Sequence, residues 1–216
     1  MITYDWPDAL RAQSDEWHLD YRNRSGGETI TGREQVIYSG LGRWVATRSI
    51  VLFDRKGILA YRALMARLKG RANAVVVGPS IGPTAPRVQP LLFGLPYPGP
   101  NLLLPAGIKA RSLGREPTLM NAAPAGANAV EIDPGTTVGL EPGVLIGFGQ
   151  RLYVIEDIDG TNYQISPKLR DAVPTYSPVI WDKPRCLMRL QADDGGSADI
   201  QLDRTGSVSL SFVEVW

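Results

Sequence analysis

Twelve of the 17 prolines in this 216-residue chain lie between Gly78 and Gly143, together with ten of the 23 glycines. Because proline cannot donate a backbone hydrogen bond, the prolines between Ser80 and Pro105 repeatedly remove donors that a sheet would need. The flanking sequence is ordinary, and 44% of all residues are hydrophobic. A chain of this length buries a sizeable core without disulfides. We therefore expect a folded protein with a loop-rich middle and regular ends.

The charges nearly cancel overall but not along the chain. The net charge is +1, yet residues 1–79 carry 12 Lys/Arg against 8 Asp/Glu, and residues 191–216 carry one against five. A total near zero does not favour a polyanion-binding surface, so we expect no specific nucleic-acid binding. We expect the basic and acidic ends to meet, within one copy or between copies.

Other sequence features exclude whole classes of protein. A single cysteine, Cys186, excludes an internal disulfide and a Cys-rich zinc site. No apolar run approaches the roughly 18–20 residues of a membrane span. Asp5 and Asp8 stand where a signal peptide would have a basic segment. We expect a soluble protein made in a reducing cytoplasm.

The first 79 residues predict strands and one helix. Alternation of apolar and polar residues predicts strands near 17–21, 35–39, 44–53 and 74–77, with a turn at 23–27. Between the last two strands, apolar residues recur every three or four positions, which predicts a helix over about 55–69. Asp54 suits its N-cap and Gly70 its end.

The remaining sequence predicts further short strands. They lie at 129–132, 144–148, 151–158, 162–166, 178–181, 187–191, 198–202 and 207–215. Spacings of about 8–12 residues between many of them suggest a small barrel or sandwich. The whole chain is therefore predicted to be mainly β with one α-helix.

No group of residues predicts catalysis. His18 has no nucleophile or carboxylate near it in sequence to form a catalytic pair. The stretch 157–162 resembles the start of a calcium loop, but it lacks the glycine and glutamate that such a loop needs and fits a hairpin turn better. Paired carboxylates at 156–157 or at 131 and 133 suit a glycoside hydrolase only if they flank one cleft. We predict no catalytic, metal or cofactor-binding residue and no enzyme.

The predicted helix carries the chain's one notable run of basic residues. It is either a solvated face or an interface with an acidic neighbour, such as another subunit's C-terminal segment. Nucleic acid is less favoured because aromatic residues do not interleave with the charges. The predicted interface residues are Arg55, Arg62, Arg67, Lys69, Arg71, Trp44, Asp199 and Asp203.

Short groups of residues along most of the chain also carry a family resemblance. They are 31–35, 42–47, 62–64 and 68–73 in the first part, and 143–147, 151–155 and 166–170 in the second. These groups resemble the distal tail protein family of long-tailed bacteriophages and its relatives in prophages and tail-like particles. Pro142-Gly143-Val144 stands where that family commonly has an aspartate.

The resemblance implies a tail-tube-like β-sandwich or split barrel, formed by residues 1–79 with 191–216. Residues 80–190 would be a Pro/Gly-rich arm and an inserted β module. The implied function is a structural virion protein that forms a homo-oligomeric ring, usually hexameric, at the tail tip. Its partners would be the tail tube protein and the tail-tip hub protein.

The alternative is a module that binds a host-surface glycan or receptor. Tyr163, Tyr176 and Trp181 are its candidate stacking residues.

Overall fold

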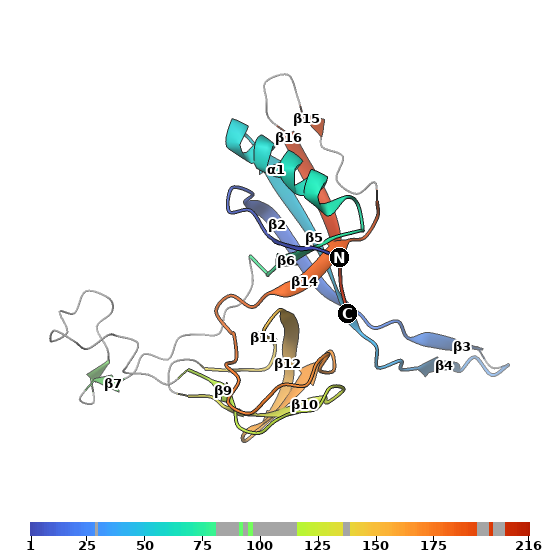
Figure 1. Ribbon diagram of the computed structural model, residues 1–216. Helices are drawn as coiled ribbons and strands as arrows, with labels where there is room; N and C mark the ends of the chain where they lie inside the picture. Colours follow the sequence, from blue (N-terminus) through green and yellow to red (C-terminus); the bar gives the residue numbers. More distant parts are fainter. Residues whose placement is uncertain are drawn as a thin grey trace. The chain divides into compact units, whose positions relative to one another are not determined.

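The computed structural model describes residues 1–28, 30–80, 91–92, 95–96, 116–135, 139–193, 199–200 and 206–216. The described chain is mainly β with one α-helix, which confirms the predicted fold class (Figure 1). It divides into two compact units, Met1–Gly82 with Arg185–Trp216, and Pro83–Pro184. Most of the Pro/Gly-rich segment predicted at the start of the insertion lies outside the described residues.

A mixed seven-stranded sheet forms the first unit. Its strands are β1 (Thr3–Asp5), β2 (Ala12–Asp20), β5 (Arg43–Leu52), β6 (Ala74–Val77), β14 (Cys186–Leu190), β15 (Asp199–Ile200) and β16 (Gly206–Glu214). They follow the order β1-β6-β14-β16-β5-β2, and β15 pairs with β16. β1 and β6 are parallel, and all other pairs are antiparallel.

The position of β14 corrects the predicted boundary of the insertion at residue 190. β14 pairs with β6 on one side and with β16 on the other. Its buried side chains, Cys186, Met188 and Leu190, alternate along the strand and so share one face of the sheet. Residues 186–190 therefore belong to the sheet of the first unit.

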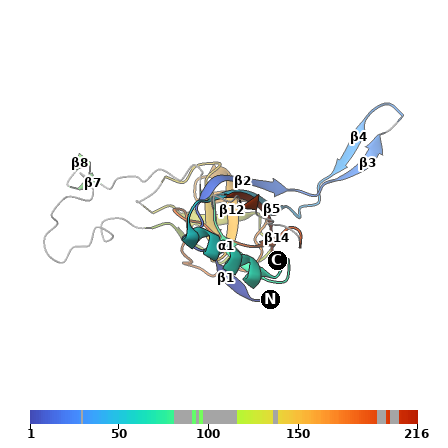
Figure 2. The same cartoon turned by 90° about the horizontal axis from the view of Figure 1, so that it is seen from above.

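Helix α1 (Arg55–Leu68) lies along one side of the sheet (Figures 1 and 2). The Asp54 carboxylate accepts a 2.6 Å hydrogen bond from the backbone N–H of Gly57, which caps the helix as predicted. Lys69 and Gly70 both adopt left-handed backbone angles, with φ of 51° and 63°. This conformation ends the helix.

The core of the first unit is formed by apolar side chains of α1 and the sheet. The helix buries Ile58, Tyr61, Leu64 and Leu68. The sheet buries Ile50, Leu52, Leu210 and Phe212, each at most 1% exposed. Burial raises the pKa of the Tyr61 hydroxyl above its ordinary value, because ionisation there would place a charge among apolar groups.

The second unit contains a five-stranded sheet. Its strands are β9 (Thr118–Leu119), β10 (Ala129–Asp133), β11 (Leu145–Phe148), β12 (Arg151–Asp159) and β13 (Asn162–Ser166), in the order β11-β12-β13-β10-β9. A separate pair, β7 (Leu91–Leu92) and β8 (Leu95–Pro96), belongs to the same unit. The segment 173–180 bridges both edges of the five-stranded sheet, pairing Pro178 with Thr118 and Ile180 with Gly147. The sheet therefore closes into a small barrel, one of the two forms predicted.

The barrel has its own hydrophobic core. Its largest fully buried side chains are Leu119, Ile132, Ile146, Leu152, Tyr153, Ile155 and Ile165. All of these except Leu152 belong to one apolar cluster, to which all five strands contribute and which holds the barrel together.

Candidate assembly surfaces

A two-stranded ribbon leaves the first unit between β2 and β5. Its strands, β3 (Arg24–Glu28) and β4 (Glu34–Ile37), form a sheet of their own in the described chain. All nine residues are exposed, and Figure 1 shows the ribbon extending away from the sheet. We call the described residues from Arg24 to Tyr38, which are 24–28 and 30–38, the arm. A lone two-stranded ribbon is marginally stable in water, so the arm needs a partner surface.

Large apolar side chains lie on the second strand of the arm and just after it. Val36, Ile37 and Tyr38 are 56%, 54% and 62% exposed. The ring of Tyr38 lies 6.4 Å from that of Tyr21, which is also exposed. Adjacent apolar side chains left in water in this way are typical of a protein-binding surface.

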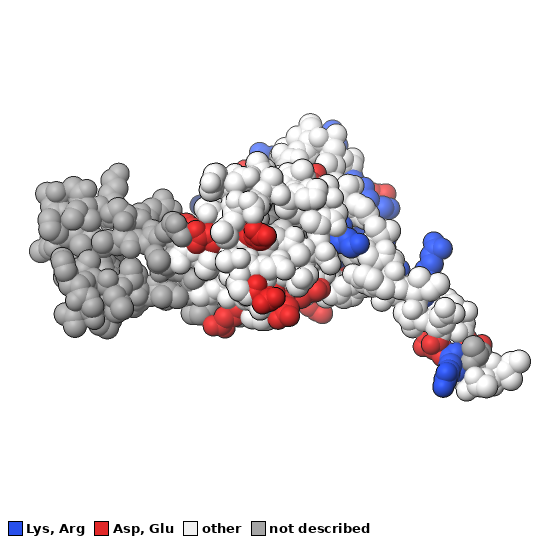
Figure 3. Space-filling view, turned by 90° about the horizontal axis from the view of Figure 1, so that it is seen from below, with Lys and Arg blue, Asp and Glu red and all other residues white. Residues whose placement is uncertain are grey.

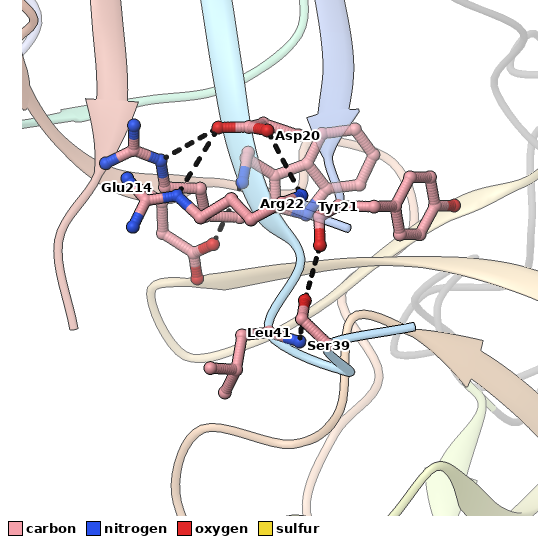
Figure 4. A network of polar contacts seen from close by, with 8 residues as sticks. Asp20, Tyr21, Arg22, Ser39, Leu41 and Glu214 are labelled. Atoms are coloured by element: carbon pink, nitrogen blue, oxygen red, sulfur yellow. Dashed lines mark hydrogen bonds and ion pairs between the residues drawn. The ribbon is translucent and has the colours of Figure 1, made fainter. Parts of the chain in front are cut away.

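Hydrogen bonds link the residues at the base of the arm (Figure 4). The Asp20 carboxylate accepts hydrogen bonds from the Arg22 backbone N–H at 3.3 Å, from Arg22 Nε at 3.5 Å and from Arg43 Nε at 3.4 Å. On the returning strand, the Ser39 hydroxyl donates to the Tyr21 carbonyl at 2.6 Å. Arg22 has a φ of 50°, which is unusual for a residue other than glycine. These bonds fix the direction in which the arm leaves the sheet.

The exposed side of α1 carries the predicted basic residues. Arg55, Arg62, Arg67, Lys69 and Arg71 are all exposed, as predicted for an interface, and their role in assembly stays a prediction. Arg67 also lies over the Tyr4 ring, 5.8 Å from its centre. Between the charges runs an apolar stripe formed by Leu59, Ala63 and Ala66, all exposed.

Trp44 is not on the surface, and its prediction as an interface residue is wrong. It is 4% exposed, and its ring meets that of Trp17 edge-on at 6.3 Å. Strand β5 is central, so its apolar residues on the helix side are covered. The Trp44 backbone N–H donates a 3.0 Å hydrogen bond to the buried Glu214 carboxylate.

The acidic C-terminal segment meets the basic N-terminal unit mainly through backbone groups. Asp193 accepts a 2.9 Å hydrogen bond from the Arg71 N–H, and Glu214 is bound to the Trp44 N–H as described. Asp203 lies outside the described residues, and Asp199 is described only as a position in β15. The two described acids are therefore engaged within their own chain.

Two of the three predicted glycan-stacking residues are buried, so their prediction is wrong. Tyr163 is 3% exposed in the barrel core, where burial and then the nearby Asp133 charge raise its pKa. Trp181 is 6% exposed, and its Nε1 donates to Glu116 at 2.9 Å. Tyr176 is different, with 79% exposure and a φ of 63°. A bulky residue at positive φ is strained, and such strain is often found at functional positions.

The outer face of the barrel is acidic. Across β12, β13 and β10, Asp159 pairs with Asn162, which pairs with Glu131, and Asp157 lies one pleat away opposite Gln164. These side chains share the face opposite the core residues Ile158 and Tyr163. In the view from below, acidic side chains outnumber basic ones on the surface presented (Figure 3). Glu131 and Asp157 belong to the carboxylate pairs considered above for a glycoside hydrolase, and Asp157 and Asp159 belong to the stretch that resembles the start of a calcium loop.

A buried ion pair lies beside a cavity of about 640 Å³ in the first unit. Arg48 donates through Nε and Nη2 to the two carboxylate oxygens of Asp15, at 3.1 and 2.6 Å. Arg48 also donates to the Gly78 carbonyl at 2.6 Å and lies 4.8 Å above the Trp6 ring. The Ser80 N–H donates to Asp15 at 2.7 Å. The ion pair thus binds the backbone of Gly78 and Ser80, just after the end of β6.

Within the described residues, no group of three or more His, Cys, Asp or Glu is placed to hold a metal ion. Cys186 is fully buried at 0% exposure. The described helix is too short and too polar to cross a membrane.

A second cavity, of about 380 Å³, lies in the barrel between Phe148, Tyr153 and Pro174.

No family model matches the sequence, and no curated protein matches it. Function is therefore inferred from the surfaces of the molecule together with the sequence resemblance.

Proposed function

We propose that this protein is a structural component of a bacteriophage tail tip, where copies of it assemble into a ring, hexameric in the resembled family. The ring joins the tail tube protein to the tail-tip hub protein, and the protein is located in the virion after synthesis in the host cytoplasm. The observation that carries the proposal is the arm, because its exposed apolar residues Val36, Ile37 and Tyr38 need a second molecule to cover them.

The arm is compatible with a ring. It projects from one end of the β2–β5 pair, and in the proposed ring it would contact a different surface on the next copy. Contacts between two different surfaces repeat head to tail and close into a ring when the rotation allows. Such an assembly needs no catalytic residue.

Light scattering tests this proposal. The full chain is expected to have a mass several times 23.5 kDa. Replacing Val36, Ile37 and Tyr38 together by serine should reduce it to a monomer that melts at nearly the same temperature. The matched control is Phe53→Ser, which removes a side chain of 67% exposure outside the arm. A full chain that stays monomeric at high concentration, or an arm variant with unchanged mass, contradicts the proposal.

A second candidate function is binding of a host-surface glycan by the barrel. Exposed Tyr176 supports it, since a tyrosine ring held in a fixed place can stack on a sugar. Its backbone is held by a 2.8 Å hydrogen bond from its N–H to the Leu119 carbonyl. Glycan-array binding that is lost in Tyr176→Ala and kept in Tyr176→Phe is the expected result, and equal binding by both variants contradicts it.

A further inference from the structure

The described molecule has two exposed faces of opposite charge on different units. Residues 54–71 carry six Lys/Arg and one Asp, whereas residues 116–184 carry nine Asp/Glu and four Lys/Arg. The basic residues lie on the uncovered side of α1, and three of the acids share the outer face of the barrel.

The side chains on the helix are arranged for docking. By helix geometry, Arg55 and Arg62 form one row about 10.5 Å long, and Lys56 and Arg67 lie on the other side of the Leu59–Ala63–Ala66 stripe. Small residues between two rows of cations allow a flat partner to approach closely. Leu59 is 51% exposed and supplies apolar contact at the centre.

The barrel face has matching dimensions. Asp157 and Asp159 are two residues apart on β12, a separation of about 7 Å, and Asp159 and Glu131 are two strands apart, about 9.5 Å. All three are exposed. The amide side chains of Asn162 and Gln164 lie between the carboxylates and add hydrogen-bonding groups without positive charge. The face is acidic, and its charge complements that of a helix edged with basic residues.

We propose that the basic face of α1 in one copy docks on the acidic outer face of the barrel in the next copy. This inference rests on the proposed ring, and it names a second head-to-tail contact in addition to the arm. The barrel is chosen over the described part of the C-terminal segment because three exposed carboxylates share the outer face of the barrel, whereas Glu214 of the C-terminal segment is buried. Complementary charge patches of this kind fix the register of a contact and speed its formation.

Charge reversal tests the contact. Arg55→Glu with Arg62→Glu reverses the helix face, and Asp157→Lys with Asp159→Lys reverses the barrel face. Each pair should weaken self-association about tenfold or more, as expected when attraction across an interface becomes repulsion. The chain with all four substitutions should regain the assembled state, as should an equal mixture of the two double variants. Arg11→Glu with Asp182→Lys is the control, since both residues are exposed and lie outside these faces.

Salt gives a second readout. Assembly of the full chain should weaken as NaCl rises from about 50 mM to about 500 mM, because exposed charges are screened over shorter distances. Melting temperatures of all variants should stay close to that of the full chain, which separates loss of contact from loss of fold. Double variants that assemble normally, or reversed faces that do not rescue each other, overturn the inference. In that case the arm variant still reports on the ring itself, so the two proposals fail separately.

Discussion

The Asp15–Arg48 pair offers the sharpest test of what holds the first unit together. The two side chains are 0% and 4% exposed, so both charges are removed from water. Arg48→Leu would leave the carboxylate of Asp15 buried with the Ser80 N–H as its remaining described donor. Arg48 would also no longer bind the Gly78 carbonyl or cover Trp6. An uncompensated buried charge of this kind costs about 3–5 kcal/mol.

The double variant Asp15→Leu with Arg48→Leu separates charge from packing. It removes both ions and leaves apolar side chains in their place, a change that is often close to neutral in buried pairs. We expect it to be at least about 2 kcal/mol more stable than Arg48→Leu alone. The stability lost in Arg48→Leu therefore reflects the buried carboxylate left without its partner. It does not measure the net contribution of the ion pair to the stability of the protein.

Urea unfolding followed by tryptophan fluorescence measures both effects. Four of the five tryptophans, Trp6, Trp17, Trp44 and Trp216, lie in the first unit. With a slope of about 1.5 kcal/mol per molar urea, a loss of 3 kcal/mol lowers the midpoint by about 2 M. A loss below about 1 kcal/mol in Arg48→Leu, or a double variant as unstable as the single one, refutes the reasoning.

Three further predictions follow from single contacts. Gly70→Ala should destabilise the first unit by about 1–3 kcal/mol in urea, because Gly70 has a φ of 63° and a Cβ there would lie 2.8 Å from Asp193 Oδ1. Asp20→Asn should cost less than about 1 kcal/mol, because its ion pairs are partly exposed, yet it should slow assembly measured by stopped-flow light scattering through a looser arm. The pKa of Tyr163 is higher in the folded protein than in the unfolded chain, so it contributes stability that is present below about pH 10 and is lost as the pH rises toward the pKa in the folded protein. Tyr163→Phe should therefore reduce the fall in melting temperature between about pH 9 and 11.

The helix could be predicted from sequence because its signals are local. Asp54, the spacing of Ile58, Tyr61 and Leu64, and Gly70 lie within one continuous segment, and each acts on its neighbours. Four predicted strands of the barrel match β10 to β13 closely, since alternation and hairpin turns are local as well, whereas 178–181 forms only isolated bridges and β9 was not predicted. Local rules cannot say which strands pair, so the position of β14 was missed.

The arm was missed because its sequence gives conflicting signals. Gly26 and Gly27 indicate a turn, but they lie in a strand that pairs with β4 across a bulge. Val36, Ile37 and Tyr38 resemble the buried side of an ordinary strand, and only the three-dimensional structure leaves them in water. The reverse error affected Trp44, Tyr163 and Trp181, since an aromatic residue has the same sequence signature on a surface and in a core.

The position of β16 makes folding of the first unit dependent on late events in synthesis. This strand lies between β5 and β14, and it pairs with β5 from residue 206 to residue 213. Its partner β5 leaves the ribosome more than 150 residues earlier. Until β16 is synthesised, the edge of β5 that pairs with it stays open, while the barrel can fold as a separate unit during translation. A chain terminated before β16 would therefore have a folded barrel and a sheet in which β5 lacks one of its neighbours. We expect only chains that contain β16 to assemble.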